Sequence, residues 1–196
     1  DWSVNGVQTC ALPICRIGGA PGLTVPAGVN VQPTDRSQPT DLLGALKFTG
    51  QQGKVRYGTL LAYEDDLAIG GTLDDGSPIT LTTTGRDFIV GRALYEDTNS
   101  GGRRSIGWMG TSVMHPDINE SVNAIDAHYF SADNRWVIDS SFMRSDNDRE
   151  VGYGGMADFR FRPERGKQHT LRATYFDEFL DINGLGFLTR NDQMNL

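Results

Sequence analysis

Residues 152–162 read Gly-Tyr-Gly-Gly-Met-Ala-Asp-Phe-Arg-Phe-Arg, and this stretch decides the fold class. In an extended chain, successive side chains point to opposite faces. One face carries Tyr153, Gly155, Ala157, Phe159 and Phe161, and the other carries Gly154, Met156, Asp158, Arg160 and Arg162. Aromatic and charged side chains are thus separated with a period of two, which is typical of a β-strand whose faces meet different surroundings.

Seven other segments alternate in the same way and are predicted as strands. They are Leu42–Thr49, Val55–Glu64, Asp87–Glu96, Ser105–Met114, Ser121–Phe130, a strand that begins at Trp136, and His169–Asp177. Because neighbouring segments are joined by turns, each chain reversal creates an antiparallel pair. The expected fold class is all-β: an antiparallel up-and-down meander of about eight strands, forming part of a transmembrane β-barrel.

The connections between these segments are alternately short and long. The predicted short turns are 51–54, 98–102, 131–134 and 163–166. The longest connection is Asp65–Arg86, which holds Gly70-Gly71 and is predicted as a large loop with a short strand at Ile79–Thr83. In bacterial outer-membrane barrels, short turns face the periplasm and long loops face outside. The four short turns are therefore expected on the periplasmic side.

Strand length favours a membrane barrel over a soluble sheet. Ten residues that rise about 3.4 Å each and tilt near 40° cover about 26 Å, close to the apolar band of an outer-membrane barrel. Outer-membrane lipid is then the expected partner, in the outer membrane of a Gram-negative bacterium. The alternative is a soluble β-sandwich or a lipocalin-like binding module, since periodicity alone does not separate a lipid-facing side from a packed one.

Composition excludes two classes of protein. Hydrophobic residues make up 38% of the 196 residues, and no apolar run reaches the roughly 18 residues of a membrane-spanning helix. The formal net charge is −7 and the sequence pI is near 4.9. Because phosphate backbones bind to basic faces, we expect no nucleic-acid partner.

The N-terminal region is expected to lie outside the barrel. The block Val7–Ile14 resembles the translation of a sequencing-adapter oligonucleotide, and we interpret residues 1–15 as an artefact. The alternative is an authentic segment with a disulfide between Cys10 and Cys15. Residues 16–41 are predicted as an extended linker rich in Pro and Gly, and residues 42–196 as a partial barrel. Since no Met begins the chain, a fragment of a longer product is expected.

Four sequence blocks stand in a distinctive order along the chain: Arg16–Gly19, Gly44–Gly50, Asp87–Arg92 and Asn183–Asp192. In order and spacing they resemble the bacterial family catalogued as domain of unknown function 5916, over nearly all of Arg16 to Leu196. The resemblance implies an exported protein with an N-terminal carbohydrate-binding-like module of the family-nine type, followed by an outer-membrane β-barrel. Only barrel sequence is present, so a carbohydrate ligand would bind through the missing module. Passage or surface handling of glycan-like ligands is the function that this implies.

The sequence offers no catalytic, cofactor-binding or metal-binding residues, and we expect neither an enzyme nor a cofactor. The three histidines are scattered, and no Ser, His and acid set has the spacing of a hydrolase. The charged positions on the non-aromatic faces of the strands form the one notable constellation. We predict that they line a polar lumen, either as cross-strand ion pairs or as a substrate-selective surface. They are Asp126, His128, Asp139, Asp158, Arg160, Arg162 and Arg172.

Overall fold

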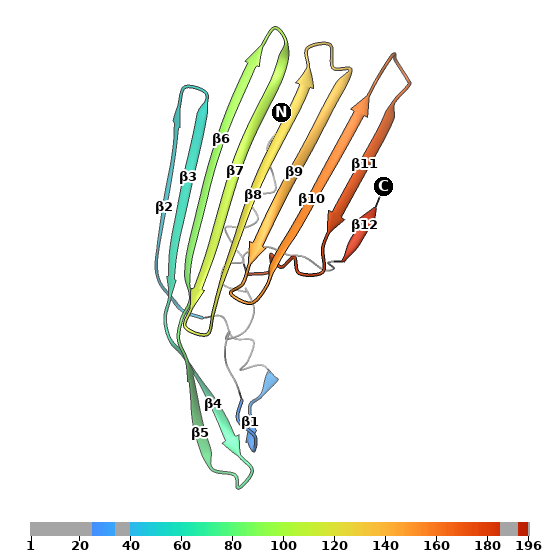
Figure 1. Ribbon diagram of the computed structural model, residues 1–196. Coiled ribbons are helices and arrows are strands. Elements are labelled where there is room, and N and C mark those ends of the chain that lie inside the picture. Colours follow the sequence, from blue (N-terminus) through green and yellow to red (C-terminus); the bar gives the residue numbers. More distant parts are fainter. Residues whose placement is uncertain (1–24, 34–39, 185–191, 196) are drawn as a thin grey trace. The chain divides into compact units, whose positions relative to one another are not determined.

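A computed structural model describes residues 25–33, 40–184 and 192–195 of the chain. In these residues the protein is all-β, and its long strands run antiparallel to one another in an up-and-down meander (Figure 1). The predicted all-β class and antiparallel up-and-down meander are therefore confirmed. The adapter-like block and both cysteines lie outside the described residues. Among the residues described, no helix has the length and apolarity needed to cross a membrane.

All eight predicted strands are present, and four of them, β2, β6, β7 and β8, are slightly longer than predicted. They are β2 (Leu42–Gln52), β3 (Val55–Glu64), β6 (Asp87–Asn99), β7 (Gly102–His115), β8 (Ile118–Ser131), β9 (Trp136–Asp146), β10 (Val151–Phe161) and β11 (His169–Phe176). A short β12 (Gln193–Asn195) pairs with the end of β11. The nine strands form one sheet in the order β12-β11-β10-β9-β8-β7-β6-β3-β2.

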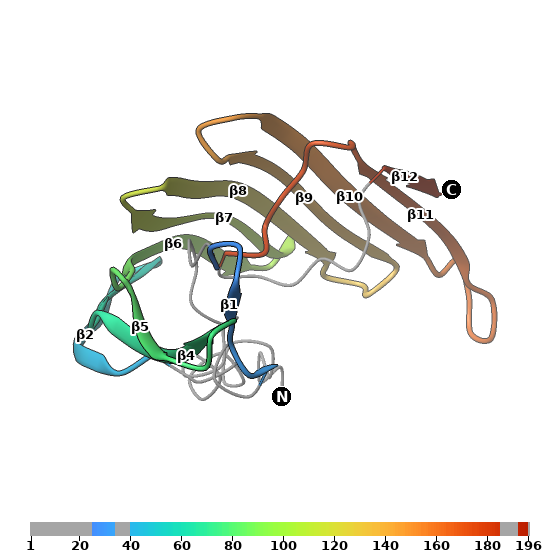
Figure 2. The ribbon, with the colours of Figure 1, turned by 90° about the horizontal axis from the view of Figure 1, so that it is seen from below.

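The chain divides into two compact units. The first contains the described residues up to Ala45, together with Ala62–Asp87 and Met114–Ile118. The second contains Leu46–Leu61, Phe88–Val113 and the described residues from Asn119 onward, and so holds most of the nine-stranded sheet. Figure 2 views β7 to β11 from below and shows these strands side by side in a single layer.

The segment Asp65–Arg86 folds into a hairpin. The short strand predicted at Ile79–Thr83 is present, and the prediction that the rest is a large loop is wrong. The strands of the hairpin are β4 (Leu67–Leu73) and β5 (Pro78–Thr83), and Ile69 pairs with Leu81 in their register. The Gly70-Gly71 pair, interpreted as a turn signal, lies inside β4. The reversal comes later, where Asp75 Oδ1 accepts hydrogen bonds from the amide and hydroxyl of Ser77. The β-branched residues of the two strands favour extended backbone, and the hairpin forms although Gly70 and Gly71 lie in its first strand.

The described part of the predicted linker contains a further strand. β1 (Val29–Asn30) pairs with β4 and makes a three-stranded sheet in the order β1-β4-β5. Two predicted turns are also shorter than expected. Two residues, 53–54, connect β2 to β3 instead of the four of 51–54, and two residues, 100–101, connect β6 to β7 instead of the five of 98–102. Gly102 has a φ of 114°, which a tight reversal demands and a side chain would resist.

Strand register confirms the predicted separation of side chains onto two faces. Ala127 pairs with Ser140, Ser140 with Ala157, and Ala157 with Ala173, so these residues share one face. We call this the apolar face of the second unit. Its large, exposed apolar side chains on β8 to β12 are Ile125, Tyr129, Trp136, Ile138, Phe142, Val151, Tyr153, Leu171, Tyr175 and Met194.

Side chains on the apolar face are open to the surroundings. Ile125 at the middle of β8 is 51% exposed, Phe142 opposite it on β9 is 55% exposed, and Leu171 on β11 is 60% exposed. We call the other side, which carries Asp139 and Asp158, the polar face. Buried apolar residues of the second unit, such as Val137 at 6% exposure, lie there instead. In a soluble sheet, the large apolar side chains lie mostly on the buried face. In this sheet they are exposed on one face, and the face with the charged residues holds the buried positions.

Candidate functional site

Charged side chains from five strands form a continuous series of ion pairs on the polar face. We call this series the ion-pair ladder. Each contact joins residues on different strands or two strand positions apart, so the ladder runs across the sheet instead of along one strand. Its members are Arg92 on β6, Asp126 and His128 on β8, Asp139 on β9, Asp158 and Arg160 on β10, and Arg172 on β11.

The first contact of the ladder bridges an entire strand. Arg92 on β6 makes a bidentate ion pair with Asp126 on β8, and its Nη2 donates to Asp126 Oδ2 over 2.9 Å. The intervening strand β7 presents Gly107 beneath this pair. A Cβ added at Gly107 would lie 2.8 Å from Asp126 Oδ2, closer than real Cβ atoms approach such a neighbour. The absence of a side chain at Gly107 is therefore what lets the two charges meet.

His128 connects two carboxylates at the centre of the ladder. Its Nδ1 lies 2.8 Å from Asp139 Oδ1 on the neighbouring strand, and its Nε2 lies 3.2 Å from Asp126 Oδ2 on its own strand. Register places His128 directly opposite Asp139. Each ring nitrogen of His128 therefore faces a carboxylate oxygen, so the imidazole connects the two carboxylates.

Two arginines complete the ladder on β10 and β11. Arg160 Nη2 donates to Asp139 Oδ2 over 3.0 Å, and its Nε lies 3.4 Å from Asp158 Oδ1. Arg172 then donates to Asp158 Oδ2 from Nη2 over 2.7 Å and from Nε over 3.1 Å. The three arginines and the three aspartates of the ladder balance in charge.

Most of the predicted polar set is brought together in this ladder, with one exception and one addition. Arg162 lies outside it, because its Nε donates to Gln168 Oε1 over 2.8 Å near the turn between β10 and β11. Arg92 belongs to the ladder but was not in the predicted set. The signal that could have found it is the combination of an arginine on β6 with glycine at position 107 of the next strand.

A segment after β11 folds back over the polar face. We call Asp177–Gly184 the crossing segment. Asp177 still continues the β10–β11 pairing, since its amide donates to Tyr153 O over 3.1 Å. The backbone at Leu180 then rests directly on Gly152 of β10, where an added Cβ would collide with it. Leu180 is only 1% exposed and is among the most buried side chains described.

The crossing segment continues over the next strands. The Asp181 amide donates to Ser145 Oγ on β9 over 3.0 Å, and Ser145 is 3% exposed. A Cβ at Gly184 would contact the Glu120 carboxylate of β8 and lie 3.3 Å from a methyl group of Val113 on β7. The segment therefore spans β10, β9, β8 and β7 on the polar side, as the red trace after β11 shows in Figure 2.

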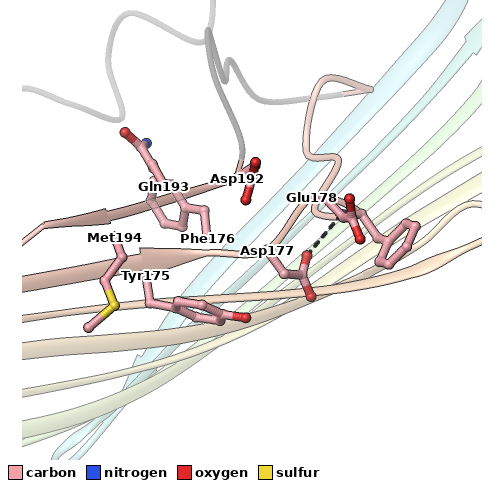
Figure 3. Close-up of a pocket in the computed structure, with 8 residues that line it drawn as sticks. Tyr175, Phe176, Asp177, Glu178, Asp192, Gln193 and Met194 are labelled. Atoms are coloured by element: carbon pink, nitrogen blue, oxygen red, sulfur yellow. Dashed lines mark hydrogen bonds between the residues drawn. The ribbon is translucent and has the colours of Figure 1, made fainter.

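A shallow depression of about 440 Å³ lies where the crossing segment leaves β11 (Figure 3). Three acidic side chains line it, and one of them, Asp177, is held by two backbone hydrogen bonds: its Oδ1 accepts from the Phe179 amide and its Oδ2 from the Tyr153 amide. These bonds fix the start of the crossing segment. The lining consists of Tyr175, Phe176, Asp177, Glu178, Phe179, Asp192, Gln193 and Met194.

Comparison with family models, with curated proteins and with solved structures found no match to this chain. In the described part of the chain, no group of three or more His, Cys, Asp or Glu side chains is placed to hold a metal ion. The site is therefore defined by its own geometry: a charge-balanced ladder in mid-sheet, and a crossing segment over one end of the same face.

Proposed function

We propose that this sheet forms part of the wall of a bacterial outer-membrane β-barrel. Its apolar face contacts lipid acyl chains, and its polar face lines a water-filled interior. The single observation that carries the proposal is the concentration of large exposed apolar side chains on one face of β8 to β12. The opposite face holds the ion-pair ladder, and Met156 is the one large exposed apolar side chain described there on these strands. A contiguous apolar surface of this extent is costly in water and is favourable in lipid.

The polar face supports the passage of polar solutes. Arg172 is 72% exposed and Arg92 is 36% exposed along their side chains, so the ladder retains access to solvent. Guanidinium and carboxylate groups can exchange their mutual hydrogen bonds for bonds to hydroxyl groups of a passing solute. Glycan-like ligands are the class that the family resemblance adds. The crossing segment would narrow their path at the end of the sheet where β9 turns into β10.

The soluble β-sandwich is the weaker alternative. A sandwich buries one face of each sheet against the other, with inner-face residues interdigitated. Among the described residues of the second unit, Phe142, Leu171 and Tyr175 each remain more than half exposed on the apolar face. A sandwich would also leave the ladder on its solvated surface, where it would stabilise the fold only weakly.

Five consecutive positions of β11 offer a direct test. Single cysteines are placed at residues 171–175 in a chain whose Cys10 and Cys15 are changed to Ser, and each is given a nitroxide label. The protein is folded into lipid vesicles, and relaxation by oxygen, which concentrates in lipid, is compared with relaxation by a water-soluble nickel complex. Labels at Leu171, Ala173 and Tyr175 are expected to respond to oxygen, and labels at Arg172 and Thr174 to nickel.

Two results would contradict the proposal. If all five labels respond equally to the nickel complex, both faces of β11 are in water. If the protein remains monodisperse in buffer without detergent, and the odd-numbered labels are shielded from both reagents, the apolar face is packed against protein, as in a sandwich.

A further inference from the structure

The two ends of the sheet in the second unit differ in charge. One end holds the connections between β2 and β3, β6 and β7, β8 and β9, and β10 and β11, and we call it the short-turn end after the turns predicted there. It carries an excess of cations, because each acid of β6 near that end is shared by two of them. Glu96 pairs with Arg56 and Arg103, and Asp97 pairs with Lys54 and Arg104. The opposite end is acidic: its charged residues include Glu120, Asp146, Asp148, Glu150, Asp177, Glu178, Asp181 and Asp192, with Arg144 and Arg149.

The cationic excess continues at the turn between β10 and β11. Arg162, Arg165 and Lys167 stand there with one acid, Glu164, which forms an ion pair with Lys167. Arg165 is exposed and has no ion-pair partner among the residues that the structure describes. The neighbouring turn adds Arg135 and one acid, Asp133, whose Oδ2 lies 4.0 Å from Arg135 Nε. The Arg135 carbonyl oxygen accepts from the Arg162 amide over 2.8 Å. Backbone bonding therefore holds these two turns side by side.

An aromatic cluster lies on the apolar face directly below these cations. Trp136 and Phe161 are register partners, and their rings stack with centroids 4.0 Å apart. The His169 ring stacks on Phe161 from the other side at 6.3 Å. The Arg135 guanidinium carbon lies 5.6 Å from the centre of the Phe161 ring. The cluster thus has an apolar body in the sheet and a charged tip at the turns.

We propose that this cluster and the adjacent cations bind the phosphate headgroups of an anionic lipid surface. We call the group the aromatic–arginine rim: Arg135, Trp136, Phe161, Arg165, Lys167 and His169. The inference rests on the proposed membrane function and specifies which lipid the short-turn end contacts. Amphipathic rings are favoured at the level of lipid headgroups, where the apolar ring and the polar edge are both satisfied. The cations above them then lie at phosphate height, and Arg135 can reach a phosphate while its stem covers Phe161.

Charge complementarity selects an anionic lipid over a zwitterionic one. Near an anionic membrane surface, each Lys or Arg strengthens attachment by about fivefold. The acidic end of the sheet would be repelled by the same surface. The rim therefore gives the sheet a defined orientation, with its short turns at the anionic leaflet.

Insertion into vesicles tests the rim. The full chain is diluted from urea into vesicles of phosphatidylcholine alone, or of phosphatidylcholine mixed with phosphatidylglycerol, and the initial rate of protease protection is measured. Wild type is expected to insert faster into the mixed vesicles. For R165Q, the ratio of the insertion rate in mixed vesicles to the rate in phosphatidylcholine alone should fall by roughly fivefold. R149Q is the matched control. It removes the same charge from an exposed arginine, Arg149, in a turn at the acidic end.

The outcomes separate the two proposals. Equal insertion of wild type into both kinds of vesicle, or an equal loss for R149Q and R165Q, would overturn the lipid specificity and leave the membrane function standing. Failure of wild type to become protected in either lipid would overturn the membrane function, and the rim with it. Because R165Q removes an exposed charge in a turn, its folding in phosphatidylcholine alone is expected to match wild type.

Discussion

The His128 imidazole and the Asp139 carboxylate meet across β8 and β9, with Nδ1 and Oδ1 2.8 Å apart. The two residues are directly opposite in the sheet register. This contact is the step that joins the Arg92–Asp126 pair to the arginines of β10 and β11. Without it the ladder would be two separate groups of ion pairs.

Replacing His128 with Ala is expected to destabilise the folded protein by about 1–2 kcal/mol, because two carboxylates lose a shared partner. The midpoint of heat unfolding in detergent measures this change. A double-mutant cycle with Asp139→Ala should give a coupling energy of about 1 kcal/mol. Ser140→Ala, on the other face of β9, is the control and should change the midpoint little. A coupling energy indistinguishable from zero would show that the contact contributes nothing.

Gly107→Ala is expected to destabilise the protein by about 1–3 kcal/mol, because its methyl group would force Arg92 and Asp126 apart. Gly44→Ala is a matched control, since an added Cβ at Gly44 meets nothing within 4 Å. In a strand, Ala is otherwise favoured over Gly, so Gly44→Ala should be neutral or stabilising. Chemical denaturation of both variants compares them. Equal effects would mean that the space over Gly107 is not needed by the ion pair.

A valine at Gly152 is expected to displace the crossing segment, because the backbone of Leu180 occupies the space that a side chain needs. Hydrogen exchange of the Asp181 amide, which donates to Ser145 Oγ, reports this displacement. Exchange should accelerate in Gly152→Val and remain unchanged in Ala157→Val, which alters the opposite face of the same strand. Unchanged protection of Asp181 in the first variant would contradict the observed crossing.

A charge on the apolar face is expected to be far more costly than the same charge on the polar face. Ile125 is 51% exposed and Met156 is 46% exposed, so a soluble sheet would tolerate arginine at either position. In a bilayer, Ile125→Arg should cost about 2–4 kcal/mol and Met156→Arg much less. The folded fraction in vesicles across a urea series distinguishes the two cases. Similar losses at both positions would argue against lipid contact.

Stability at acid pH is expected to depend on Asp133 in the turn between β8 and β9. The Ser131 hydroxyl, followed by the Arg135 amide, donates to this carboxylate and lowers its pKa. A carboxyl whose pKa is depressed in the folded state stabilises the fold above its unfolded pKa, and the contribution is lost as pH falls through the folded pKa. Wild type should therefore unfold later than Asp133→Asn at neutral pH. The difference between their unfolding midpoints should vanish in strong acid, and a constant difference would exclude this explanation.

The strands, their two faces and most of the ladder could be predicted from the sequence because they depend on local pattern. Alternation along Tyr153 to Phe161 fixes which side chains share a face, whatever the partner strand is. The same locality explains the error at Asp65–Arg86, where Gly70-Gly71 suggested a turn although the pairing of β4 with β5 outweighed it.

The sequence by itself determined an antiparallel meander with one apolar and one charged face. The reason is that successive side chains of a strand point to opposite faces, so a period of two can be recognised from neighbouring residues alone. Only the tertiary structure decided that Arg92 reaches Asp126 over Gly107, that Arg162 turns away to Gln168, and that Leu180 lies on Gly152. Each of these depends on the register between strands and on the path of a connection. Such choices are set by packing between residues distant in the chain, and no local spacing encodes them.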